Sequence, residues 1–124
     1  MLKTLGKYYI VDIGLRNILL GYRDVDRGQI LENIVFLELK RRGYTVFIGK
    51  VDKKEVDFIA EKVGGKMYIQ VCESLGNDKT LARELAPLLE IKDNYEKIII
   101  TNDKTFVESY EGIKVKNTAD WLNE

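Results

Sequence analysis

The chain contains no histidine and only one cysteine among its 124 residues. Without histidine it has no Ser-His-Asp triad, no Cys-His catalytic pair and no zinc site with histidine ligands. One cysteine cannot form an intramolecular disulfide or a four-thiolate zinc site, which is typical of a protein from a reducing compartment. We therefore expect a cytoplasmic protein whose chemistry, if any, depends on carboxylate and amide groups.

The sequence also lacks an excess of charge and long apolar segments. Its 20 basic and 20 acidic residues cancel, so the net charge does not attract nucleic acid or an anionic membrane. The apolar runs are short, which predicts no membrane-spanning helix, and the N-terminus has no signal-peptide core. No Gly-x-x-x-x-Gly-Lys-Ser/Thr sequence occurs, so we expect no nucleotide site of the P-loop type.

The length and composition describe one globular domain. Hydrophobic residues make up 45% of the chain and charged residues 32%, which is typical of a folded protein. A chain of 124 residues is long enough for a single core. We expect residues 1–27 to form an N-terminal strand and short helix, and residues 28–124 to form the core of the domain.

Helical periodicity is clearest over residues 28–42 and 79–91. Gly43 should end the first of these helices, and Pro87 should kink or divide the second. Short polar side chains are available to cap the predicted helices. We expect these caps to be Asn77 or Asp78 for residues 79–91, Asp12 for a short helix over residues 13–20, and Thr118 for a last helical turn.

Alternating and β-branched residues predict six strands, over residues 7–11, 44–48, 54–61, 66–73, 97–101 and 113–115. The turn 63–66 contains two glycines, which predicts that the strands on its two sides are antiparallel neighbours. The buried strand after the second helix favours a parallel crossover, so the sheet should be mixed. Strict alternation places Val56, Phe58 and Ala60 together on one face of their strand.

Polar residues interrupt two of the predicted strands. Asp57 lies in the middle of its strand, where aspartate is disfavoured and needs a reason. Gln70 follows thirteen residues later and shares a strand face with Cys72. Glu32 is a further acid near the start of the 28–42 helix. Ordinary structural roles are the alternative: a buried amide for Gln70, a small apolar residue for Cys72 and a surface acid for Glu32.

Six stretches of the sequence match one known pattern, and they are Lys7–Asn17, Gly28–Val35, Glu38-Leu39, Arg42–Tyr44, Lys54–Phe58 and Tyr68–Val71. Together they resemble the C-terminal domain of unknown function that many bacterial and archaeal AAA-type ATPases carry. That domain is itself similar to PD-(D/E)xK nucleases. The resemblance implies a restriction-endonuclease-like α/β fold, with a mixed central sheet flanked by helices. It also implies an AAA-type ATPase module as partner, in the same polypeptide if the chain is a fragment.

The resemblance further implies a metal site. Glu32, Asp57 and Gln70 correspond to the positions that hold Mg²⁺ or Mn²⁺ in the nucleases, and Gln70 and Cys72 replace the second acid and the lysine of the motif. The side chain of Gln70 offers the metal an oxygen without a negative charge. The thiol of Cys72 does not replace the positive charge of the lysine. Because losing one preorganised electrostatic group typically lowers a rate by about 10²–10³-fold, we expect a degenerate catalytic site.

Three functions remain open at this point. The first is a nuclease-like accessory domain that no longer hydrolyses and binds a partner, with nucleic acid as the first candidate. The second is an active Mg- or Mn-dependent DNA phosphodiesterase that uses Glu32, Asp57 and Gln70 with a relocated cation, for which the candidates are Lys54, Lys66, Lys79 and Arg83. Glu73 and Glu84 are acids that could substitute for a lost ligand, although solvated helix or strand faces explain both more simply. The third is a non-catalytic oligomerisation or docking module.

A basic cluster at a helix end is the sequence's candidate contact for nucleic acid. It consists of Lys40, Arg41 and Arg42. A solvated helix terminus that complements the helix dipole explains these three residues equally well.

Overall fold

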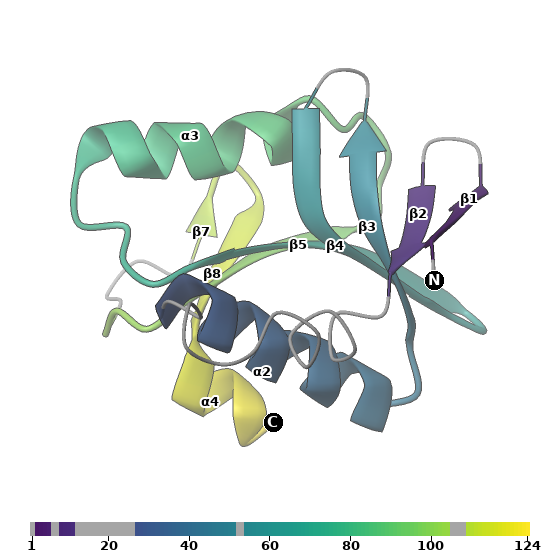
Figure 1. The fold of residues 1–124 in the computed structure, drawn as a ribbon. Coiled ribbons are helices and arrows are strands. Elements are labelled where there is room, and N and C mark those ends of the chain that lie inside the picture. Colours follow the sequence, from purple (N-terminus) through teal and green to yellow (C-terminus); the bar gives the residue numbers. More distant parts are fainter. Residues whose placement is uncertain (1, 6–7, 12–26, 52–53, 105–108) are drawn as a thin grey trace.

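In the computed structural model, which describes residues 2–5, 8–11, 27–51, 54–104 and 109–124, one mixed β-sheet is flanked by helices on both faces (Figure 1). The sheet has eight strands in the order β1-β2-β3-β4-β5-β6-β8-β7. The strands are β1 (Leu2–Leu5), β2 (Tyr8–Val11), β3 (Thr45–Val51), β4 (Lys54–Lys62), β5 (Gly65–Cys72), β6 (Glu96–Thr101), β7 (Ser109–Tyr110) and β8 (Ile113–Asn117). The helices are α2 (Arg27–Arg41), α3 (Asp78–Leu89) and α4 (Thr118–Leu122).

The direction of the strands confirms the predicted mixed sheet. Strands β1 to β5 run antiparallel to their neighbours, and β4 and β5 form the predicted hairpin. Strands β5, β6 and β8 are parallel, because helix α3 carries the chain back across the sheet between β5 and β6. The α/β class with helices on both faces is therefore confirmed.

Two apolar layers hold the helices against the sheet. Helices α2 and α4 cover one face, where Leu31, Val35, Leu39 and Trp121 belong to one buried cluster. Helix α3 covers the other face, where Leu88 belongs to a second cluster. In the described part of the chain, each helix is too short or too polar to cross a membrane.

Several element boundaries differ from the sequence predictions. Helix α3 continues through Pro87 to Leu89, so it is not divided there; the proline lies in the last turn, where few helical hydrogen bonds follow it. The cap of α4 is Asn117, whose side-chain oxygen accepts from Asp120 N, and Thr118 instead donates its hydroxyl to Thr101 O. Strands β1 and β7 were not predicted, and the expected helix over residues 13–20 lies outside the described residues.

A β-bulge in β4 overturns the predicted alternation of its side chains. Phe47 is opposite Ile59 and Gly49 is opposite Val56, so β4 has one residue more than β3 between these pairs. As a result, Val56 lies with Ile59 in the cluster under α3, whereas Phe58 lies in the cluster under α2. The extra residue falls at Asp57-Phe58, where the sequence places its unexpected acid.

Candidate functional site

The ladder between β4 and β5 stops beside the bulge, and two side chains continue the contact between the strands. The ladder runs from the hairpin turn as far as Phe58, which pairs with Ile69. Beyond it, Asp57 N donates to Gln70 Oε1 at 2.8 Å, and Val71 N donates to Asp57 Oδ2 at 2.8 Å. We call this pair of contacts the Asp57–Gln70 clamp, since each side chain holds the backbone of the opposite strand.

The amide of Gln70 also connects the sheet to helix α3. Gln70 is buried, with 4% of its surface exposed, and its Nε2 donates to Glu84 O at 3.4 Å. Its oxygen accepts from Asp57 N, so both ends of the amide are bonded within the fold. Burying an amide without such partners would cost roughly 1–3 kcal/mol, which explains why a glutamine is tolerated in the core.

Two carboxyl groups, that of Asp57 in the clamp and that of Glu84 beside it, have strongly raised pKa values. Burial raises the pKa of Asp57 to about 6; the hydrogen bond from Val71 N opposes this effect, and the charge of Glu55 adds to it. Burial also raises the pKa of Glu84 to about 7, and the charge of Asp57 raises it further. The structure thus places Glu84, on α3, within electrostatic reach of Asp57. Perturbed carboxyl groups of this kind mark candidate functional sites.

Cys72 does not supply the missing positive charge. Its thiol donates to Ser74 O at 3.1 Å, and burial raises its pKa, so the group is a neutral thiol at pH 7. Among the candidate cations whose side chains the structure describes, Arg83 is the one whose charge acts on both Cys72 and Glu84; the side chain of Lys54 lies outside this set. Lys66 lies near the hairpin turn instead, 3.7 Å from Glu61.

Glu32 belongs to a different part of the structure from Glu84. It is half-buried in the second turn of α2, and this helix covers the face of the sheet opposite to α3. Its proposed contribution to a metal site with Asp57 and Gln70 stays a prediction.

The described residues offer few free ligands for a resident Mg²⁺ or Mn²⁺ ion. Such ions require several oxygen ligands in a nearly octahedral arrangement. Within residues 27–51, 54–104 and 109–124, no three His, Cys, Asp or Glu side chains are grouped so that they could hold a metal. Asp57 and Glu84 provide two carboxyl groups, but Gln70 Oε1 and Asp57 Oδ2 already accept hydrogen bonds from the backbone.

The basic cluster at the end of α2 is partly used by the fold. Arg41 and Arg42 both bond to Glu38, whose pKa falls to about 2, chiefly through the hydrogen bond from Arg41. Arg42 also donates to Trp121 O at 2.5 Å and lies 4.5 Å from the centre of the Trp121 ring. Arg42 is therefore a structural anchor for α4, whereas Lys40 and Arg41 remain exposed. A nucleic-acid contact at the three residues stays a prediction.

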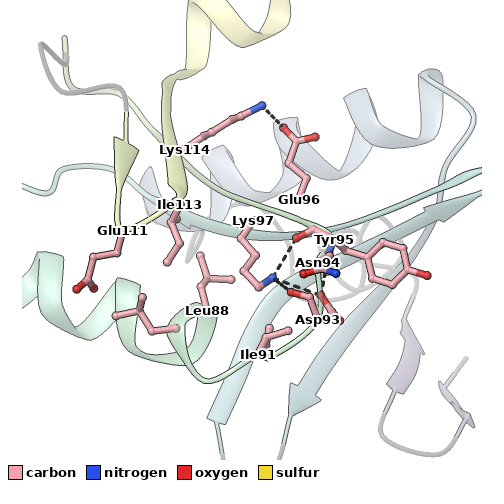
Figure 2. A pocket seen from close by; sticks show the side chains of 12 residues that line it. Leu88, Ile91, Asp93, Asn94, Tyr95, Glu96, Lys97, Glu111, Ile113 and Lys114 are labelled. Atoms are coloured by element: carbon pink, nitrogen blue, oxygen red, sulfur yellow. Dashed lines mark hydrogen bonds and ion pairs between the residues drawn. The ribbon is translucent and has the colours of Figure 1, made fainter.

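A pocket of about 480 Å³ lies where α3 ends and β6 and β8 begin (Figure 2). Lys97 Nζ contacts Asp93 O, Asp93 Oδ1 and Tyr95 O at 2.9, 3.3 and 3.0 Å, and Glu96 pairs with Lys114. Its charged lining residues include three acids and two lysines, so the pocket has one excess negative charge. This composition does not favour an anionic ligand.

Comparison with known proteins gives relatives without an assigned activity. The chain is 46% identical over 121 residues to an uncharacterized protein of Haemophilus influenzae, a match that covers 98% of this chain and 30% of that protein. It is 39% identical over 111 residues to uncharacterized protein MJ1544 of Methanocaldococcus jannaschii, covering 82% of this chain and 24% of that protein. The chain therefore spans less than a third of the length of these curated relatives. No family model matches it.

Proposed function

We propose that the chain is a restriction-endonuclease-like domain whose metal-dependent centre has become a structural clamp, and that it acts by binding rather than by hydrolysis. The observation that supports this proposal is the use of Gln70. Its oxygen, the only atom of that side chain able to bind a hard cation, accepts from Asp57 N, and its nitrogen donates to Glu84 O. At a metal-binding position, the same oxygen would face an ion.

We further propose that this domain serves an AAA-type ATPase module, with nucleic acid as the partner that it binds. The relatives support the first part, since each is more than three times as long as the segment that matches it. The rest of each relative is long enough to contain a separate catalytic module.

Metal binding and cleavage test the proposal directly. Mn²⁺ should be titrated calorimetrically into the wild type, Asp57→Asn and the matched surface variant Glu55→Gln. Asparagine keeps an acceptor for Val71 N, so the clamp is preserved while the charge is removed. We expect equal, negligible heats for all three proteins and no nicking of plasmid DNA with Mg²⁺ or Mn²⁺. Cleavage that Asp57→Asn abolishes and Glu55→Gln retains would overturn the proposal.

An active phosphodiesterase is the second candidate, and the charged groups that favour it are Glu84 and Arg83. Glu84 adds a carboxyl group near Asp57, and the charge of Arg83 acts on Cys72. This candidate predicts that Arg83→Gln and Glu84→Gln both abolish Mn²⁺-dependent cleavage, whereas Lys92→Gln, at an exposed site just after the end of the same helix, does not. If neither metal nor nucleic acid binds, the docking module is the function that remains.

A further inference from the structure

The pocket of Figure 2 has an apolar floor on the α3 face of the sheet. Leu88, Ile91 and Ile113 are at most 8% exposed, and all three belong to the cluster under α3. Leu89 completes the floor with a more exposed side chain at the end of the helix. A volume of about 480 Å³ above these four side chains has room for a small ligand with an apolar body.

The two lysines around the pocket are already neutralised within the fold. Lys97 Nζ contacts two oxygens of Asp93 and one neighbouring backbone oxygen, so no ammonium proton is left for an anion. Lys114 pairs with Glu96 at 3.2 Å. Because Lys114 follows Ile113 in β8, it points to the opposite face of the sheet from the floor. Neither lysine therefore makes the floor a site for a negative charge.

Glu111 is the acid of the pocket that keeps an unneutralised charge. Among the residues that the structure describes, its carboxylate has no hydrogen bond or ion pair. Figure 2 shows Glu111 on one side of the pocket and Asp93 on the other, with the floor between them. Glu111 and Gly112 form the β7–β8 turn with positive φ angles of 49° and 85°. Such a turn favours glycine or asparagine, so the turn itself does not explain a glutamate.

The C-terminal end of α3 adds negative potential to the same pocket. Leu88 and Leu89 line the pocket and belong to the last turn of α3, where the backbone carbonyls carry the negative end of the helix dipole. This last turn contains no basic residue. Lys92 follows the cap of the helix, but it is not one of the residues that line the pocket. The helix end and Glu111 therefore both favour a positive charge above an apolar floor.

From this arrangement we infer that the pocket binds an alkylammonium group, with the aliphatic chain on the apolar floor and the ammonium at Glu111 beside the end of α3. The side chain of a lysine in a partner protein and a free linear polyamine share this chemistry. The inference uses no residue of the Asp57–Gln70 clamp and does not rest on the proposed function. Failure of one therefore leaves the other testable.

Two-dimensional NMR spectra of the backbone amides in the full chain, titrated with pentylamine at low ionic strength, test the site. The amides of Leu89, Gly112 and Ile113 should shift, and pentanol, which has the same chain without the charge, should bind more weakly. Glu111→Gln should weaken the binding of pentylamine about two- to fivefold, the range of an exposed ion pair, and leave that of pentanol unchanged. Glu55→Gln, at an exposed acid outside the pocket, is the matched control and should change neither affinity. Leu89→Ala should weaken both ligands, because both chains lie on the floor.

Spermidine and a blocked tripeptide with a central lysine distinguish the two sources of the ligand. Tighter binding of the peptide identifies a protein partner, and tighter binding of spermidine identifies a free polyamine; either result supports the site. Absence of the shifts, or equal binding of pentylamine and pentanoate, would overturn the inference. So would an unchanged affinity for pentylamine in Glu111→Gln. Shifts of the same size with ammonium chloride would also reject it, since the aliphatic chain would then contribute nothing.

Discussion

Replacing Asp57 with asparagine should stabilise the protein at pH 8 and leave its stability nearly unchanged at pH 4. Asparagine has the same shape and retains an oxygen that can accept from Val71 N, so the Asp57–Gln70 clamp should persist. The change removes a carboxyl group whose charged form is disfavoured by burial. Most core substitutions destabilise a protein, so a gain at this position would be informative.

The magnitude follows from the raised pKa of Asp57. In the unfolded chain its pKa is near the ordinary value of 3.8, and in the folded protein it rises to about 6. Well below pH 3.8 both states are protonated, so the group has no effect. Between pH 4 and pH 6 the unfolded chain gives up its proton first, and the wild type loses stability as pH rises. The full shift corresponds to at most about 3 kcal/mol, and we expect about 2 kcal/mol after solvent screening.

Urea denaturation at pH 4 and pH 8 measures this difference, with the emission of Trp121 as the signal. Trp121 is the only tryptophan and is 1% exposed, so unfolding should shift its spectrum. Glu55→Gln removes a charge from an exposed position on the same strand and should change stability by less than about 0.5 kcal/mol. A loss of stability in Asp57→Asn at pH 8, or a gain of equal size at both pH values, would refute the reasoning.

Two further substitutions test the packing around the site, both by the free energy of unfolding in urea. Gly49→Ala would place a Cβ atom 2.7 Å from Cγ1 of the buried Ile59 and should cost about 1–3 kcal/mol. Gly65→Ala, the control, meets open space and should change stability by less than about 0.5 kcal/mol. Equal effects of the two substitutions would contradict the bulge geometry. Arg42→Gln should cost about 1–2 kcal/mol, because it removes the cation–π contact with the Trp121 ring and the hydrogen bond to Trp121 O. Arg41→Gln removes only the bonds to Glu38 and should cost clearly less. A larger loss for Arg41→Gln would show that Arg42 does not anchor α4.

Periodicity was enough to predict most elements of the fold. The hairpin β4–β5, the parallel crossover through α3 and the two long helices follow from apolar spacing and from the glycines of the turn. The bulge in β4 was missed, because alternation has no signal for one extra residue other than the aspartate itself. The misassigned face of Val56 is a direct result of that omission.

The candidate site could be predicted only in part. Asp57 and Gln70 were identified because polar groups inside strands need partners, and the structure joins them. The sequence indicates Glu84 only as a possible substitute acid, since no local pattern shows that helix α3 brings it near Asp57.

The bond between Arg42 and Trp121 joins residues 79 positions apart and so affects the order of assembly. Closing so long a loop costs entropy before any contact repays it, so this joint should form late in folding. Until it forms, α2 and the end of β8 have no covering from α4, and an intermediate at this stage exposes apolar surface that can associate with other chains. Deleting residues 118–124, which include α4, should therefore lower the yield of correctly refolded protein more than it lowers the final helix content.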